Sequence, residues 1–323
     1  MIKSTLGSAD LAEAWASIEP LIEKTPVMTS GHLDEMTGAQ LFFKCEHLQT
    51  TGSFKMRGAT HAVGLLPDSC PGVATHSSGN HGAALACAAA RRNLRAEIVV
   101  PENAGAAKLA NIHRHGARVH FCRPDQSSRE AALNELARQG LETIPPYDDD
   151  RIIAGQGSAA LEMFAQIDGL DALVVPVGGG GLISGCALAA QMTKTPPQVI
   201  GVEPLGADDT VRSLAQGKRV DSSDHHPDTV ADGLNALIGK RNFQLVSELV
   251  ERVVTVSDEQ IMAAALAIWR ELKQVAEPSG ATALAGVLAN PSIFAGRRVG
   301  VIISGGNIDP GTYVAALKAH GRE

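Results

Sequence analysis

Short runs of β-branched and other apolar residues recur along the chain, and alanine-rich stretches long enough for helices separate them. The apolar runs predict strands at residues 72–76, 96–100, 117–121, 172–176, 198–202 and 298–303. The stretches between them predict helices at residues 82–92, 106–115, 128–139, 154–167, 181–192 and 258–274. Strands that are apolar throughout and alternate with helices are typical of parallel sheets covered on both faces. The pattern therefore predicts an α/β fold with parallel-rich sheets flanked by helices.

Composition narrows the class of protein. The chain has 323 residues, of which 44% are hydrophobic, so it can bury one large core or two ordinary ones. The net charge is −7 with acids and bases interspersed, which argues against a nucleic-acid or anionic-membrane partner. No apolar run is long enough to cross a bilayer, and the first residues do not resemble a secretion signal. Five cysteines without a Cys-x-x-Cys pair predict reduced thiols in a cytoplasmic protein.

Three of the predicted strands end in turns that carry unusual chemistry. The first strand is followed by HSSGNHG at residues 76–82, and the fourth by four glycines at residues 178–181. The last strand is followed by SGGN at residues 304–307. In parallel sheets, ligands bind at the carboxyl ends of strands. We therefore expect these three turns to form the functional site.

The four glycines predict a phosphate-binding turn. They open a predicted helix, so their bare backbone N–H groups and the helix dipole all favour an anion at one point. The alternative is a tight turn that needs positive φ, for which one or two glycines would be enough. A dinucleotide-binding fingerprint fits this turn only loosely, and the Gly-Lys pairs at residues 217–218 and 239–240 lack the Ser or Thr of a nucleotide-binding P-loop.

Lys55 has the complementary chemistry. The stretch TTGSFKMRGA at residues 50–59 places this lysine just after a Gly-Ser turn, where a helix is expected to begin. A helix N-terminus disfavours the ammonium, so we expect a lowered pKa and an amine able to form an imine and carry protons. A phosphate-binding turn combined with such a lysine is what pyridoxal phosphate requires.

Taken in order, TGSFKMRGA, HSSGNHG, the four glycines and SGGN resemble the serine/threonine dehydratase and serine racemase family. Its members are pyridoxal-phosphate enzymes of the tryptophan-synthase-β-like fold, and the resemblance runs from about residue 21 to 316. It implies a large cofactor-binding domain formed by residues 1–50 and 147–323, and a small substrate domain formed by residues 51–146. It also implies a homodimer.

The same resemblance implies roles for the residues that bind the cofactor. Lys55 would form the imine, Phe54 would flank the cofactor, Asn80 would contact the 3-hydroxyl group, and Ser304 would meet the pyridine nitrogen. The phosphate would be held by Gly178, Gly179, Gly180 and Gly181. Considered alone, Asn80 could instead cap the following helix, and Ser304 could serve the turn itself.

The substrate carboxylate is expected at the HSSGNHG turn, which contains Ser77, Ser78, Asn80 and His81. His81 could equally be a polar core residue. Ser78 is the informative position, because L-specific threonine dehydratases commonly carry alanine there, whereas serine racemases and hydroxyaspartate dehydratases carry serine. A hydroxyl on the face of the cofactor opposite Lys55 could deliver or remove the α-proton. The alternative is a small loop residue without a catalytic role.

A divalent metal is also expected. The run VEPLGADD at residues 202–209 resembles the metal site of the racemase branch, where Glu203 and Asp209 would supply carboxylates and Ala207 a backbone carbonyl. All-oxygen ligation suits Mg²⁺, with Ca²⁺ or Mn²⁺ as alternatives. An acidic turn exposed to solvent is the other interpretation.

The resemblance implies β-elimination from a 3-hydroxy amino acid of the serine or threonine type, giving a 2-oxo acid and ammonia. Serine racemase, hydroxyaspartate dehydratase and a non-catalytic cofactor-binding protein are the alternatives. The run PPYDDD at residues 145–150 departs from the family pattern, which leaves the preferred β-substituent open. Arg129 could help to bind the substrate or lie on a solvated helix. Because few residues follow SGGN, we expect an enzyme without a C-terminal regulatory domain.

Overall fold

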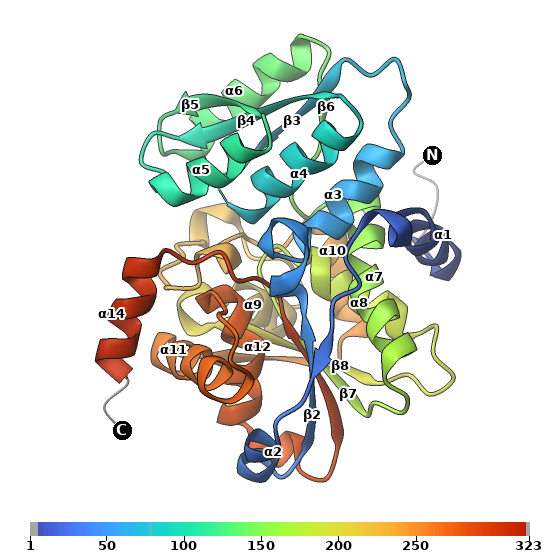
Figure 1. The fold of residues 1–323 in the computed structure, drawn as a ribbon, viewed down its shortest axis with the longest axis vertical. Coiled ribbons are helices and arrows are strands. Elements are labelled where there is room, and N and C mark those ends of the chain that lie inside the picture. The colour runs from blue at the N-terminus through green and yellow to red at the C-terminus, as the bar shows by residue number, and fades with distance from the viewer. Residues whose placement is uncertain (1–5, 78, 321–323) are drawn as a thin grey trace.

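The chain folds into two lobes, each built around its own β-sheet (Figure 1). The computed structural model describes residues 6–77 and 79–320. The larger sheet has the strand order β1-β2-β10-β7-β8-β9 and the smaller one β5-β4-β3-β6. All paired strands are parallel except β1, which is antiparallel to β2. The strands are β1 (Val27–Met28), β2 (Gln40–Cys45), β3 (Gly72–His76), β4 (Arg95–Pro101), β5 (Arg118–Cys122), β6 (Glu142–Thr143), β7 (Ala172–Pro176), β8 (Gln198–Pro204), β9 (Arg252–Val256) and β10 (Arg298–Ile303).

Helices cover both faces of each sheet. They are α1 (Ser8–Ile18), α2 (Gly31–Thr37), α3 (Lys55–Gly64), α4 (Asn80–Arg91), α5 (Ala106–Arg114), α6 (Gln126–Arg138), α7 (Asp150–Gln166), α8 (Gly181–Ala190), α9 (Asp209–Gln216), α10 (Lys240–Leu249), α11 (Asp258–Ala267), α12 (Pro278–Ala289), α13 (Pro291–Phe294) and α14 (Pro310–His320). In β7, Leu173 and Val175 face α1, α7, α8 and α10, whereas Ala172 and Val174 face α2, α11, α12 and α13. Successive strand residues point to opposite faces, so an apolar strand is buried on both sides.

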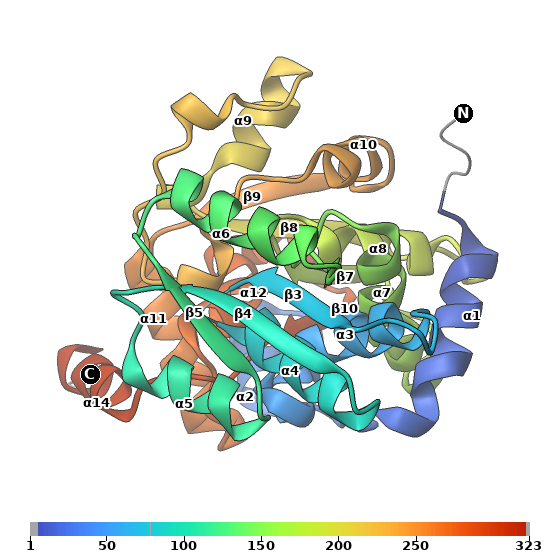
Figure 2. The same ribbon diagram turned by 90° about the horizontal axis from the view of Figure 1, so that it is seen from above.

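The small sheet is covered in the same way. Val73 and Ile98 belong to a core shared with α4 and α5, whereas Ala74 and Val99 pack with α6. Seen from above, α6 lies on one side of this sheet and α4 and α5 on the other (Figure 2). The α/β prediction with parallel-rich sheets is confirmed.

All six predicted strands and all six predicted helices are present, with ends that shift by a few residues. One helix differs in kind, because α11 ends at Ala267 and a π-helical turn (Ile268–Leu272) follows it. The pattern does not predict β1, β2, β6 or β9, and in β2 the buried Lys44 interrupts the apolar run. The five cysteines are free thiols, as predicted. None of the described helices is long and apolar enough to cross a membrane.

A buried cluster of charges joins the two lobes at α3. Arg57 is fully buried, and its Nε and Nη2 atoms donate to the Glu46 carboxylate at 2.7 and 2.8 Å. Its Nη2 atom also donates to Glu162 of α7 at 3.0 Å, and Lys44 of β2 donates to the same carboxylate oxygen at 2.5 Å. Burial opposes the ionisation of Glu46, but the Arg57 charge outweighs it and holds the pKa of Glu46 below its ordinary value. Two cations and two anions thus balance one another and fix α3 against β2 and α7.

Replacing Arg57 by leucine should therefore destabilise the protein strongly. Arg57→Leu leaves two buried carboxylates with one cation, and breaking a buried pair in this way costs about 3–5 kcal/mol. Urea unfolding followed by circular dichroism measures the loss. The matched control is Arg138→Leu, which breaks an exposed ion pair with Glu135 and should cost about 1 kcal/mol or less. Similar losses in the two variants would contradict a structural role for the buried cluster.

Candidate active site

Lys55 is the first residue of α3, and the turn before it is bound to the end of β10. The Phe54 N–H donates to the Ser304 carbonyl at 3.1 Å, and Ser53 forms a β-bridge with Gly305. These backbone contacts place the start of α3 beside the SGGN turn. The structure therefore brings two of the predicted motifs together.

The Lys55 amine sits in an enclosed place. Its Nζ donates to the Pro146 carbonyl at 2.7 Å and lies 5.0 Å from the centre of the Phe54 ring. Part of the side chain is still accessible, as a ligand-binding amine must be. Burial lowers the pKa of Lys55 to about 7. The sequence predicted this direction from the helix dipole, whereas enclosure by the protein is the main cause in the structure.

The four glycines form the turn between β7 and α8, and none of them has room for a side chain. Gly180 has φ of +90°, in the left-handed region. A Cβ atom on Gly179 would lie 2.3 Å from the Tyr147 ring, and one on Gly178 would lie 2.9 Å from the Leu234 Cα. Gly181 begins α8, and no side chain caps this helix. The turn thus presents bare backbone N–H groups at a helix start, which suits a phosphate.

The HSSGNHG turn of the small lobe reaches the SGGN turn of the large lobe through Asn80. Its side chain does not cap α4, whose N-cap is Gly79. Instead, Asn80 Nδ2 donates to Glu277 Oε1 at 2.6 Å, and Asn307 Nδ2 donates to Asn80 Oδ1 at 2.8 Å. Both ends of the amide are therefore held, and one N–H of Nδ2 remains to face a ligand.

Sequence analysis did not identify Glu277. A glutamate before Pro278 looks like an ordinary helix start, since Glu277 is also the N-cap of α12. The fold instead buries its carboxyl group beside Asn80, and burial raises the pKa of Glu277 to about 8. Its contact with Asn80 spans 197 positions of the chain, so no local signal marks it.

The remaining predicted residues of these turns lie close by. The His81 ring is buried, with Nε2 3.0 Å from the Ile144 carbonyl. Burial and then the Lys55 charge lower the pKa of His81 to about 3, so the ring is neutral and Nε2 donates. Ser77 Oγ accepts from the Gly79 N–H, and Ser304 Oγ donates to the Ser279 carbonyl at 3.3 Å. Ser78 lies outside the described residues.

These groups fit pyridoxal phosphate. The glycine turn can hold the phosphate, and the Lys55 amine, whose pKa is lowered to about 7, can react with the aldehyde. His81 Nδ1 and both polar atoms of the Gln156 amide are buried without a hydrogen-bond partner among the described residues. Buried polar atoms seldom remain unpaired, so such atoms are expected where a ligand binds.

The predicted metal ligands also lie together. Glu203, at the end of β8, accepts the N–H groups of Thr210 and Val211 at 3.1 and 3.0 Å. Asp209 Oδ2 accepts the Ile238 N–H at 2.8 Å, while its Oδ1 is buried without a hydrogen-bond partner among the described residues. Burial, followed by the charge of Asp209, raises the pKa of Glu203 to about 8. Asp209 Oδ1 lies 3.5 Å from His225 Nδ1, so this ring also borders the two buried carboxylates. Two buried carboxylates fit a cation, and the buried Ala207 belongs to the same turn.

Only two of the three carboxylates in the run at residues 202–209, those of Glu203 and Asp209, are buried, whereas Asp208 is partly exposed and pairs with Arg212. In the described parts of the chain, no group of three or more His, Cys, Asp or Glu side chains could hold a metal ion. Any cation here would depend on backbone carbonyls and water for its other ligands, as oxygen-preferring cations commonly do.

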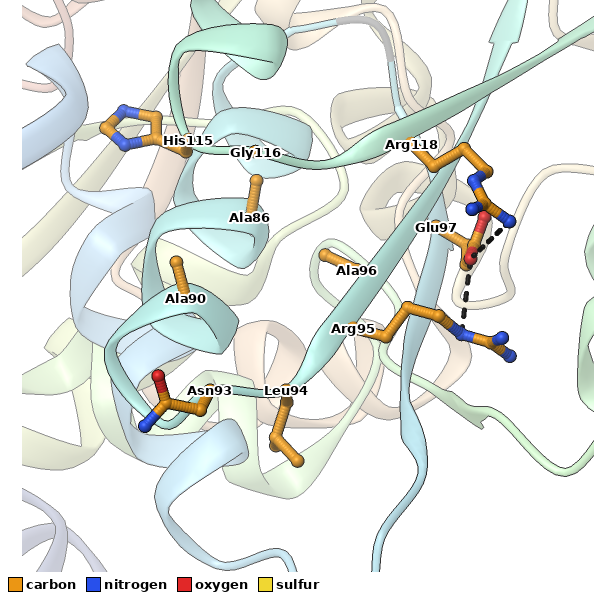
Figure 3. A pocket seen from close by; sticks show the side chains of 10 residues that line it. All are labelled: Ala86, Ala90, Asn93, Leu94, Arg95, Ala96, Glu97, His115, Gly116 and Arg118. Atoms are coloured by element: carbon orange, nitrogen blue, oxygen red, sulfur yellow. Dashed lines mark ion pairs between the residues drawn. The ribbon is translucent and has the colours of Figure 1, made fainter.

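A separate hollow of about 470 Å³ lies on the small lobe, between α4 and the starts of β4 and β5 (Figure 3). Ala86, Ala90 and His115 line it, and at its rim Arg95 and Arg118 form ion pairs with Glu97. None of the predicted site residues lines this hollow. It is distinct from the candidate active site.

Comparison with known proteins agrees with this geometry. The model of the family described as "Pyridoxal-phosphate dependent enzyme" matches residues 18–305. The chain is 46% identical over 303 residues to a beta-hydroxyaspartate dehydratase from Paracoccus denitrificans (strain Pd 1222), covering 93% of this chain and 96% of the relative. It is 42% identical over 313 residues to a serine racemase from Dictyostelium discoideum, covering 95% and 96% of the two chains.

Solved structures also resemble this chain over nearly its whole length. The crystal structure of serine racemase from Dictyostelium discoideum superimposes with a TM-score of 0.89, covering 95% of this chain and 100% of the other at 42% identity. The crystal structure of a threonine deaminase from T.th. also gives a TM-score of 0.89, covering 94% and 99% at 38% identity. The chain therefore belongs to the family of pyridoxal-phosphate-dependent enzymes, and the predicted tryptophan-synthase-β-like class is confirmed. The domain boundaries and the roles of single residues stay predictions.

The Lys55 amine should react at neutral pH. Because an amine is nucleophilic only when unprotonated, acetylation of Lys55 in the cofactor-free protein should rise with a midpoint near pH 7. An unperturbed lysine has its midpoint at about pH 10.4. Competitive labelling with acetic anhydride, read by peptide mass spectrometry, measures the midpoints of Lys55 and of the surface lysines in one sample. A Lys55 midpoint within a unit of the surface lysines would show that the site does not lower its pKa.

Proposed function

We propose that the chain is an ammonia-lyase that converts a 3-hydroxy amino acid of the serine or threonine type to a 2-oxo acid and ammonia. The observation that carries the proposal is the Lys55 amine, whose pKa is lowered to about 7 beside the SGGN turn. Its hydrogen bond to Pro146 links it to the segment that packs on the glycine turn. The relatives named above are a dehydratase, a deaminase and a serine racemase, and the first two names describe elimination reactions.

Each residue then has a definite task. Bound pyridoxal phosphate supplies the carbonyl that captures the substrate amine and the ring that accepts the electron pair left at Cα. The Lys55 amine would act as the base that takes the α-proton. The N–H groups of residues 178–181 and the α8 dipole would hold the phosphate. The hydroxyl of Ser304, which donates to the Ser279 carbonyl in this structure, would rotate to meet the ring nitrogen. Asn80, fixed by Glu277 and Asn307, would donate its remaining N–H to the 3-hydroxyl oxygen.

The substrate carboxylate is assigned to the turn containing Ser77, Ser78, Asn80 and His81. Because His81 Nε2 already donates to the backbone, the backbone N–H groups and hydroxyls of this turn are the better carboxylate donors. Racemisation is the second candidate function. The serine at position 78 and the 42% identity to a serine racemase favour it, since Ser78 can act as a second acid–base group.

An assay panel tests the reaction and the substrate class together. The purified protein with pyridoxal phosphate should release 2-oxo acid from at least one of serine, threonine and 3-hydroxyaspartate. The 46% identity to a hydroxyaspartate dehydratase places that substrate first in the panel. Lys55→Ala should lower the rate by about 1,000-fold or more, because both imine formation and proton transfer are lost.

The control for this variant is Lys24→Ala, which changes an exposed lysine and should keep the wild-type rate. Chiral chromatography of residual serine separates elimination from racemisation. Racemised serine without 2-oxo acid would favour the second candidate. Retention of activity by Lys55→Ala would overturn the proposal.

We also propose that Glu203, Asp209 and the Ala207 carbonyl bind Mg²⁺, or Ca²⁺ or Mn²⁺ in its place. The proposal is supported by the two buried carboxylates, where burial and then repulsion by the Asp209 charge raise the pKa of Glu203, and by Asp209 Oδ1, which has no hydrogen bond among the described residues and lies 3.5 Å from His225 Nδ1. A cation would relieve the repulsion and tie β8 to the start of α9. Its role would be structural, because no residue of the candidate active site belongs to this turn. A homodimer and a cytoplasmic location also remain predictions.

Chelation should then destabilise the protein. A metal present at about 100 times its dissociation constant adds about 2.7 kcal/mol of stability. EDTA should therefore lower the melting temperature, and added Mg²⁺, Ca²⁺ or Mn²⁺ should restore it. Asp209→Asn should abolish the response, whereas Asp208→Asn, at a carboxylate paired with Arg212, should keep it. A melting temperature that changes with neither EDTA nor added metal would exclude a metal site at Glu203 and Asp209.

A further inference from the structure

Helix α7 lies between the two helices that carry the candidate chemistry. A Cβ atom on Gly155 would lie 2.7 Å from the Gly58 Cα, so α7 and the lysine helix α3 touch at backbone distance. A Cβ atom on Gly157 would lie 2.7 Å from the Gly185 carbonyl oxygen, so α7 meets the phosphate helix α8 in the same way. The two glycines thus allow α7 to set the separation between α3 and α8.

Gln156, between these glycines, points its amide into the junction of the three helices. The residue is fully buried. Its Oε1 lies 2.7 Å from the position that a Cβ atom on Gly181 would take, and its Nε2 lies 3.3 Å from the corresponding position on Gly58. Gly181 is the first residue of α8. The amide therefore lies beside the helix start at which the phosphate is expected.

Neither Nε2 nor Oε1 of Gln156 has a hydrogen-bond partner among the described residues. Gln166, on the same helix, shows the usual arrangement, because its Nε2 donates to the Thr25 carbonyl and its Oε1 accepts from Lys44. A buried amide left unpaired costs free energy, and an apolar side chain of the same shape would avoid that cost. The Gln156 amide therefore makes no hydrogen bond within the described parts of the chain that would explain its burial by packing alone.

We infer that Gln156 is a further residue of the anion site and that its amide hydrogen-bonds the anionic group bound at the start of α8. A half-turn about its Cγ–Cδ bond exchanges the two ends of the amide, so N–H₂ can face the anion. That the anion is the phosphate of pyridoxal phosphate rests on the proposed function. In that case Gln156 also fixes the distance between the phosphate and Lys55. This follows because the flanking glycines hold α7 against both helices.

Substitution by methionine distinguishes this role from simple packing. Gln156→Met keeps the length of the side chain but removes both unpaired polar atoms, so the cofactor-free protein should melt at the same temperature or higher. Its dissociation constant for pyridoxal phosphate should rise about 10-fold or more, since a hydrogen bond to a charged group is lost. Pyridoxal, which lacks the phosphate, should bind with unchanged affinity. Cofactor fluorescence titration and differential scanning calorimetry measure these quantities.

Two other variants complete the experiment. Thr60→Val is the matched control, because Thr60 is buried on α3 and its hydroxyl also lacks a partner among the described residues. Thr60→Val should leave the affinities for pyridoxal phosphate and for pyridoxal unchanged. Gln156→Glu keeps the shape of the side chain and places a carboxyl group against the anion, so it should weaken pyridoxal phosphate binding and spare pyridoxal. This variant keeps the test decisive if the methionine variant fails to fold.

The outcomes separate the two proposals. If wild type binds pyridoxal phosphate and Gln156→Met binds it equally well, or loses affinity for pyridoxal to the same degree, the role of Gln156 is refuted and the proposed function stands. A lower melting temperature of the cofactor-free variant with unchanged affinity would likewise mean that Gln156 only packs. If wild type binds no pyridoxal phosphate, the proposed function itself fails.

Discussion

The bidentate ion pair between Arg57 and Glu46 is the contact on which the rest of the site depends. Arg57 lies two positions after Lys55 on α3, and at about 100° per residue the two side chains point to nearly opposite sides of the helix. One side is held by Glu46 and Glu162 inside the protein, and the other therefore presents the amine to the site. Removing water from these charges is costly, and only their close pairing compensates for it. The rigid cluster thus sets the rotation of the helix that carries Lys55.

The site is arranged for an anion rather than for a cation. The pKa of Lys55 is lowered to about 7, so much of the amine is uncharged at neutral pH, and burial keeps the Glu277 carboxyl largely protonated. The backbone N–H groups at the start of α8 add a field that favours an anion. An anionic phosphate is attracted there, while the unprotonated fraction of the Lys55 amine remains free to react. The same enclosure serves both purposes, because removing water lowers the pKa of an amine and strengthens hydrogen bonds to an anion.

The segment at residues 145–150, which departs from the family pattern, connects the parts of this site. Pro146 accepts from Lys55, and the Tyr147 ring covers Gly179 of the phosphate turn. Asp148 accepts backbone N–H groups at the start of α10, and Asn242 of that helix donates to the Gly179 carbonyl at 2.8 Å. A change in this segment therefore reaches the amine and the glycine turn together.

The sequence alone determined the class of fold, the three turns and Lys55, because apolar strands, consecutive glycines and a lysine at a helix start are local signals. It did not reveal Glu277 or Gln156, whose surroundings come from distant parts of the chain. Arg57 was visible only as part of a motif, and its partner Glu162 lies 105 positions away. Tertiary structure decided which polar side chains are buried, paired or left unpaired. Burial and pairing set their pKa values, and neither property is encoded in the residues next to them.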